Sequence, residues 1–303
     1  MEQQKNLTLK KTVSRIALSY FAAMVVTLLT QLLMEFICKS FLYDFYMSSY
    51  FIWLASIIPL YCFGFPLTYF LFKKIPNDNI PETTSMPISS FIKLFFIGYA
   101  FLYFGNLTSL AFSSLITQFT GKVLLNPISS AIQNSNIIIT FISTVIIAPL
   151  GEEFFFRYLP YKKLAPFGDK VYILVTALFF GLFHMNIFQL LYAFLLGIIL
   201  AYMYARTRNM LYNISLHMTI NFIGGILSLT IGDNEAALII FGLFVIAAVI
   251  SGLTLFFKNR RKAIFTPAKI ETEHPAKNSI FNLGMLSFIL LFIANFIISY
   301  LHA

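Results

Sequence analysis

The sequence predicts an all-α protein, a polytopic membrane bundle of about eight or nine transmembrane helices. Of the 303 residues, 59% are hydrophobic and only 11% are charged, whereas about a quarter of the residues of soluble domains are charged. Apolar stretches of about 20 residues, the length that crosses about 30 Å of hydrocarbon, recur along the chain. Lysine and arginine gather in the short segments between these stretches. Together these observations exclude a soluble fold.

Nine apolar stretches are expected to form membrane helices. They run over residues 16–38, 50–72, 91–119, 137–158, 171–185, 187–205, 211–230, 236–257 and 280–301. The fifth is short for a complete crossing, so we expect it to begin in the cytoplasm or to stop at mid-membrane. Two proline-containing segments, 75–86 and 258–277, are predicted to be cytoplasmic loops.

The distribution of positive charge predicts the topology. When the N-terminus is placed in the cytoplasm, nearly all lysines and arginines fall on the inside, and only Lys39 and Lys122 fall outside. We therefore expect a multi-pass protein of the cell membrane with a cytoplasmic N-terminus. The formal charge of +9 then reflects membrane topology, so the lipid bilayer is an expected partner and nucleic acid is not.

Charged side chains are rare within the apolar stretches, and the fourth stretch holds three of them. Glu152 and Glu153 are adjacent, and Arg157 follows four residues after Glu153. Residues four apart share a helix face, so Glu153 and Arg157 are expected to form an ion pair. Glu152 points about 100° away from its neighbour and is left without a local cation. A free carboxylate beside a paired one is typical of a general base with a structural partner.

Two histidines lie in apolar stretches. His184 ends the fifth stretch, and His217 lies in the seventh with Asn221 four residues later on the same face. His274 and His302 lie in a loop and at the terminus, and we assign them no role.

These groups allow two hydrolytic mechanisms. In the first, Glu152 takes the proton of a water that His184 positions, and His217 with Asn221 stabilises the oxyanion. In the second, Glu152, His184 and His217 bind zinc, although the HExxH signature is absent. Each residue alone also has a structural explanation, as an interfacial ion pair or an interhelical hydrogen-bonding group, and Asn213 is interpreted in that way. The joint occurrence favours a site.

Three motifs carry a family resemblance. They are Glu152-Glu153-x-x-x-Arg157, Phe180-x-x-x-His184 and His217-x-x-x-Asn221, in this order along the chain. Together they resemble the CPBP family of intramembrane proteases, also called the CAAX protease and bacteriocin-processing or Abi family, which includes the CAAX prenyl endopeptidase type 2. The resemblance covers residues 137–230. It divides the chain into N-terminal membrane helices and loops over 1–136, a catalytic core over 137–230 and C-terminal membrane helices over 231–303.

The resemblance implies an endopeptidase whose site opens toward the cytoplasmic leaflet and cleaves a peptide or membrane-protein substrate. Carried over position by position, Glu152 looks like the residue that activates water and His184 like its partner, with His217 and Asn221 on the oxyanion side. Glu153, Arg157 and Phe180 look supportive. The family is often labelled a metalloprotease, so zinc stays open as a cofactor. Bacteriocin immunity and peptide maturation are the roles that such a relative suggests.

Two other functions are weighed against the protease. One is a non-enzymatic immunity or scaffold protein that keeps the fold. The other is a proton-coupled transporter that uses Glu152, His184 and His217 as a relay, although no internal repeat supports it. Helix counting adds a difficulty for a shared site. Glu152 and His217 lie about 13 Å from the expected inner ends at Tyr161 and Arg208, whereas His184 lies about 22 Å from Asp169.

Overall fold

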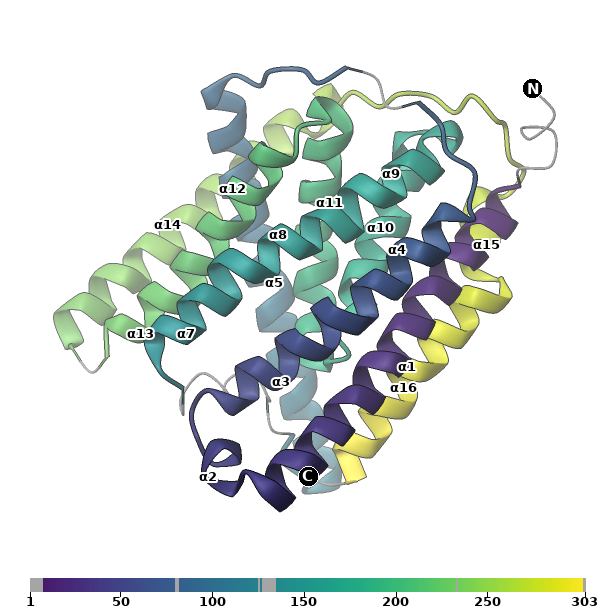
Figure 1. The fold of residues 1–303 in the computed structure, drawn as a ribbon. Coiled ribbons are helices and arrows are strands. Elements are labelled where there is room, and N and C mark those ends of the chain that lie inside the picture. Colours follow the sequence, from purple (N-terminus) through teal and green to yellow (C-terminus); the bar gives the residue numbers. More distant parts are fainter. Residues whose placement is uncertain (1–7, 80–81, 125, 127–134, 233, 302–303) are drawn as a thin grey trace.

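The structure, a computed structural model, describes residues 8–79, 82–124, 126, 135–232 and 234–301, and all regular elements in these ranges are helical (Figure 1). The α-helices are α1 (Leu9–Phe41), α2 (Tyr43–Tyr46), α3 (Phe51–Pro59), α4 (Phe65–Lys73), α5 (Ile88–Thr120), α7 (Ile137–Phe141), α8 (Ala148–Glu153), α9 (Leu159–Leu164), α10 (Asp169–Phe183), α11 (Ile187–Thr207), α12 (Met210–Asn221), α13 (Ser228–Thr230), α14 (Glu235–Asn259), α15 (Pro275–Ile280) and α16 (Leu283–Leu301). This confirms the all-α membrane fold.

Wider, π-helical turns join several of these helices into longer rods. Turn η2 (Leu60–Gly64) joins α3 to α4, turns η3 (Ile142–Ile147) and η4 (Phe154–Tyr158) flank α8, and η6 (Phe222–Leu227) joins α12 to α13. The 3₁₀ turns η5 (Ala165–Phe167) and η7 (Arg260–Lys262) end the rods of α9 and α14.

Eight helical rods in the described part of the chain are long and apolar enough to cross a membrane. They correspond to eight of the nine expected stretches, so the chain is a multi-pass membrane protein. The fifth stretch forms α10, which has 15 residues and is shorter than a membrane crossing requires. Most of α10 is buried inside the bundle, although Lys170 and Leu174 are exposed.

The fourth rod is longer than its apolar stretch suggests. We expected it to end at residue 158, but the helix continues through α9 and η5 to Phe167. The last turns contain Lys162 and Lys163, which lie beyond the expected apolar stretch. Lys163 is buried and its ammonium donates to the carbonyl of Ile75 and to Asn77, while Lys162 donates to the hydroxyl of Tyr158 at 2.6 Å. These bonds allow polar side chains to stay within the helix.

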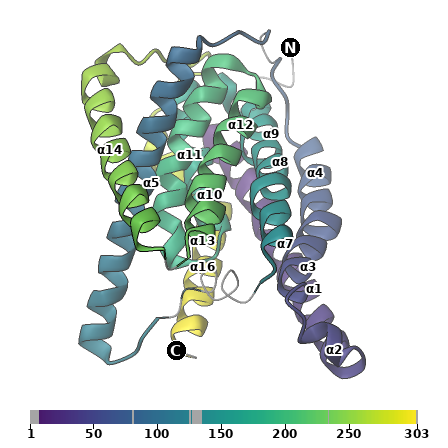
Figure 2. The same cartoon turned by 90° about the vertical axis from the view of Figure 1, so that its left-hand side faces the viewer.

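The rods pack in three groups around α10 and α11. Helices α1 and α16 lie side by side, the α3–α4 rod runs beside the α7–α9 rod, and α5 lies with α14 on the opposite side of the bundle (Figures 1 and 2). Helix α11 packs along α10 on one face and along α5 on another. Helix α12 packs against α8, and Phe180 near the C-terminal end of α10 contacts the His217 ring of α12.

Two glycines allow the outer helices to approach their partners. A Cβ at Gly252 of α14 would collide with the carbonyl of Phe96 on α5, and one at Gly284 of α16 would collide with the carbonyl of Ser14 on α1. Small residues at such contacts are the usual means by which membrane helices pack closely.

Candidate active site

The three motif-bearing helices bring their polar groups to the same level of the bundle. Glu152 lies 15 residues before Phe167, at the end of η5, and His184 lies 15 residues after Asp169, at the start of α10. The turn between these two positions is very short, so both side chains lie about 22 Å from it. The misalignment expected from the sequence therefore disappears, because the fourth rod continues past residue 158.

Glu153 is the centre of a fully buried polar network. Its Oε2 lies 3.3 Å from Nε of Arg157 and accepts a hydrogen bond of 3.0 Å from Nδ2 of Asn213, and its Oε1 accepts from Nδ1 of His217 at 2.8 Å. Glu153, Arg157 and Asn213 are completely inaccessible. The ion pair expected from the i, i+4 spacing is thus present. Its carboxylate also receives two donors from α12, so it joins the fourth rod to that helix.

Arg157 depends almost entirely on Glu153 for compensation of its charge. Within the described chain, the guanidinium nitrogens have no hydrogen-bond partner, and the ion pair is the single contact with an acidic group. The guanidinium carbon lies 4.4 Å from the centroid of the Phe180 ring, which supplies a cation–π contact. The hydroxyl of Tyr172 donates to the backbone carbonyl of Arg157 and not to its side chain.

His217 stands between the two glutamates. An ionised carboxylate can only accept, so Nδ1 of His217 carries a proton and donates it to Glu153. The other ring nitrogen, Nε2, then faces Glu152, whose Oε2 lies 3.6 Å away. Glu153 therefore fixes the tautomer and the orientation of the ring, as the second partner of a functional histidine commonly does.

Glu152 differs from Glu153 in its access to the surroundings. Its side chain is 21% exposed, whereas that of Glu153 is 0% exposed. No cation other than the nearby imidazole lies within ion-pair distance among the described residues. The pattern expected from the sequence, one paired carboxylate and one free, is the pattern that the structure shows. A partly accessible carboxylate beside a fixed imidazole can bind and deprotonate a water molecule.

His184 lies at the end of α10, against the same aromatic ring. Its Nδ1 must donate to the carbonyl of Phe180, 2.7 Å away, because a carbonyl can only accept. This leaves Nε2 available for water or substrate. The Phe180 ring packs edge-on against His184 and His217, with centroid separations of 4.8 and 5.9 Å, so one side chain spaces both imidazoles and also stacks on Arg157.

Asn221 is held by a carbonyl that a proline leaves free. In a π-helical turn the carbonyl of Thr144 would bond to the N–H five residues later, which is Pro149 and has none. Nδ2 of Asn221 donates to this carbonyl at 2.8 Å. One of its two amide hydrogens is therefore used to join α12 to the fourth rod.

An apolar groove is lined by residues that flank the two glutamates in the sequence, although neither glutamate lines it. It has a volume of about 700 Å³ and is lined by Tyr61, Phe65, Pro66, Tyr69, Phe70, Leu150, Gly151, Phe154, Phe155, Met210 and Ile214. Gly151, next to Glu152, forms part of its wall, and a Cβ there would collide with the hydroxyl of Tyr61. That hydroxyl donates to the carbonyl of Ile147 at 2.7 Å, so the tyrosine is fixed at the edge of the groove.

The zinc interpretation was tested against the donor geometry. Glutamate and histidine are suitable zinc ligands in kind. In the described part of the chain, however, no three side chains of His, Cys, Asp or Glu are grouped closely enough to hold a metal ion. As they stand, Glu152, His184 and His217 do not form a zinc site, and we derive no step through a metal.

Two residues of the site were not recognised in the sequence. Asn213 was interpreted as a helix–helix hydrogen-bonding group, yet it donates to Glu153 as well as to the carbonyl of Leu200. Asn213 lies four residues before His217, and His217 lies four residues before Asn221. This spacing, which puts all three on one helix face, was the signal in the sequence that could have identified Asn213. Tyr61 gave no signal, because its approach to Gly151 depends entirely on tertiary packing.

The fold and the site together define a multi-pass membrane protein with a cluster of glutamate, arginine and histidine enclosed among its helices. Residues 134–223 match a family model described as type II CAAX prenyl endopeptidase Rce1-like. This match, which contains every motif residue, confirms the resemblance of this segment to the CPBP (CAAX protease) family, a family of proteases. Neither curated proteins nor solved structures give a significant match.

Proposed function

We propose that the protein is an intramembrane endopeptidase in which Glu152 activates the water that attacks a peptide bond. The observation that carries the proposal is the contrast between the two adjacent glutamates. Glu153 is buried and bonded on both oxygens, whereas Glu152 is accessible and faces an imidazole that Glu153 holds in place. A scaffold protein or a binding protein does not require this division of roles.

The mechanism follows from the donors and acceptors in the site. Glu152 takes a proton from water, whose oxygen bonds to the peptide carbonyl carbon, and Nε2 of His184 holds that water in place. The second amide hydrogen of Asn221 donates to the developing oxyanion, and Nε2 of His217 does so when its ring carries both protons. The C–N bond then breaks as the proton on Glu152 passes to the leaving amine.

The apolar groove supports a hydrophobic substrate. Its lining is aromatic and aliphatic, and it reaches Gly151 at the edge of the site. A peptide that lies in the bilayer, or the apolar end of a membrane-associated precursor, would fill it and place its backbone near Glu152. We further propose that the site faces the cytoplasmic side of the cell membrane, which the positive charge of the connecting segments supports. Peptide maturation and bacteriocin immunity are the biological roles to test.

The test is cleavage of a panel of fluorogenic hydrophobic peptides by the purified protein in lipid nanodiscs. Wild type is compared with Glu152→Gln and His184→Asn. Matched controls are Glu271→Gln and His274→Asn, which change the same residue types in an exposed loop. Cleavage that is lost in the first pair and kept in the controls supports the protease. Proton-coupled uptake that Glu152→Gln abolishes, with every peptide left intact, supports a transporter instead.

A further inference from the structure

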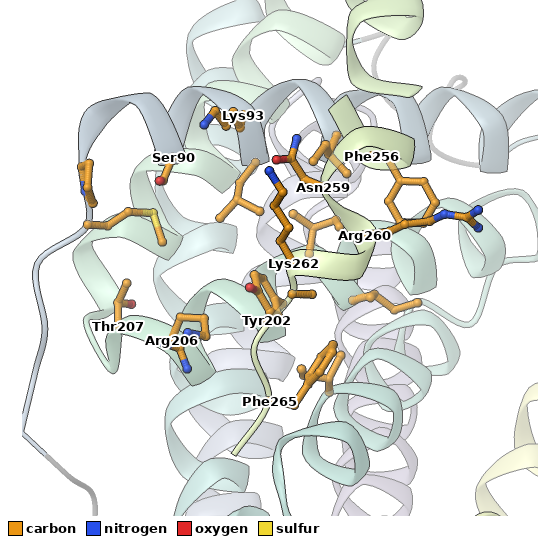
Figure 3. A pocket seen from close by; sticks show the side chains of 18 of the residues that line it. Ser90, Lys93, Tyr202, Arg206, Thr207, Phe256, Asn259, Arg260, Lys262 and Phe265 are labelled. Atoms are coloured by element: carbon orange, nitrogen blue, oxygen red, sulfur yellow. The ribbon is translucent and has the colours of Figure 1, made fainter. Parts of the chain in front are cut away.

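A second cavity lies apart from the candidate active site, at the end of the bundle where α5 begins and α11 and α14 end. Its volume is about 820 Å³ (Figure 3). It is lined by Thr84, Ser85, Met86, Pro87, Ser90, Lys93, Leu94, Ile97, Phe101, Ile173, Ile198, Ile199, Tyr202, Arg206, Thr207, Arg208, Phe256, Asn259, Arg260, Lys262, Ala263 and Phe265. The volume is in the range of small-molecule sites.

The charged side chains that line this cavity are all cationic. Lys93, Arg206, Arg208, Arg260 and Lys262 contribute five positive charges, and no acidic side chain lines the cavity. None of the five forms an ion pair with a described residue.

The five cationic side chains differ in how many contacts they make with other residues of the protein. Arg208 donates to the hydroxyl of Tyr161 and to the carbonyl of Arg206, and Arg260 lies over the ring of Phe257. By contrast, the side-chain nitrogens of Lys93 and Lys262 make no hydrogen bond to any described residue, so both are free to bind an anion. In the view of Figure 3 the Lys262 side chain runs beside Asn259, while Arg260 extends away from both.

One wall of the cavity is apolar and belongs to membrane-spanning rods. Leu94, Ile97 and Phe101 follow one face of α5, and Ile198 and Ile199 lie opposite on α11. Going along α5, the lining changes from Ser90 and Lys93 near its beginning to Phe101 further into the rod. The cavity is therefore amphipathic along the direction of the bundle, with cations toward the end and hydrocarbon toward the middle.

We propose that this cavity binds an anionic phospholipid. Its phosphate lies among Lys93, Lys262 and Arg206, and the upper part of an acyl chain lies along Leu94, Ile97 and Phe101. A membrane lipid is the ligand that carries both required parts in the right order, a negative headgroup at the interface and hydrocarbon below it. A soluble phosphate compound would satisfy the cations but leave the apolar wall uncovered. The inference concerns lipid binding and is independent of the proposed protease activity.

Native mass spectrometry of delipidated protein in detergent tests the proposal, with added phosphatidylglycerol, phosphatidylcholine or glycerol 3-phosphate as probes. The double variant Lys93→Gln/Lys262→Gln removes two cavity charges. The matched control Lys258→Gln/Arg261→Gln removes two charges from the same end of α14 at exposed positions that do not line the cavity. Size-exclusion elution and helical content verify that each variant is folded.

We expect phosphatidylglycerol to bind at least about tenfold more tightly than phosphatidylcholine. The cavity variant should weaken phosphatidylglycerol binding about 30-fold, at about fivefold for each cation near an anionic headgroup. The control variant should change it less than about threefold, since its charges lie outside the cavity. Equal binding of both lipids, equal loss in both double variants, or glycerol 3-phosphate binding as tightly as the lipid would overturn the proposal.

Discussion

Replacing Glu153 by glutamine tests whether this carboxylate has a structural role, distinct from the catalytic role that we propose for Glu152. The side chain keeps its shape, but the buried guanidinium of Arg157 loses the one acidic group within ion-pair distance in the described chain. Removing one partner of a buried pair costs about 3–5 kcal/mol, because the remaining charge is left uncompensated. The folded population relative to the unfolded one should therefore fall by about a hundredfold to several thousandfold.

The neighbouring substitution, Glu152→Gln, is the internal comparison. Glu152 is partly exposed and its loss leaves no buried cation unpaired, so we expect a change in unfolding free energy below about 1 kcal/mol. The assay is equilibrium unfolding of purified protein in mixed micelles, read by loss of helical signal. In the double variant Glu153→Gln/Arg157→Met, most of the lost stability should return, since an apolar side chain replaces the orphaned charge. Equal stability of Glu153→Gln and wild type, or no recovery in the double variant, would refute the reasoning.

Three further predictions concern contacts between helices. Gly151→Ala should reduce stability and peptide cleavage because its methyl group collides with the hydroxyl and the ring of Tyr61. Adding Tyr61→Ala, which removes the colliding ring, should restore part of both. An unchanged single variant in the same assays would contradict this. Asn221→Ala should lower the free energy of unfolding by about 0.6 to 1.7 kcal/mol, the range for interhelical hydrogen bonds. It should also lower kcat by a larger factor than it changes KM. A loss of stability with unchanged kcat would show that Asn221 takes no part in the reaction. Gly252→Leu should separate α14 from α5 and lower the unfolding temperature. In the control Gly242→Leu the new side chain meets open space, so the unfolding temperature should not change measurably. Equal effects of the two substitutions would disprove the close approach of α14 to α5.

The membrane fold could be predicted because apolar length and charge placement are properties of the sequence itself. The motif residues could be selected because ionisable groups are costly in a membrane helix and few are present. Even the pairing of Glu153 with Arg157 followed from spacing alone, since both lie on one helix.

What the sequence did not reveal depended on contacts between helices. The fourth rod continues through Lys162 and Lys163, and the buried ammonium of Lys163 donates to Ile75 and Asn77. The composition of either segment does not show that the two meet. The same contact decides whether Glu152 and His184 lie level. Asn213 had the right spacing from His217 but looked like any polar group in a membrane helix until its partner was known.

The central claim is that Glu152 makes this fold a protease. The most direct measurement is mass spectrometry of a hydrophobic peptide incubated with wild-type protein or with Glu152→Gln in nanodiscs, with both proteins shown to be equally stable. We predict two complementary fragments whose masses sum to the peptide plus one water with the wild type, and an intact peptide with the variant. Equal fragments from both proteins would contradict the account, because the bond would then be cleaved without the carboxylate that it assigns to the reaction.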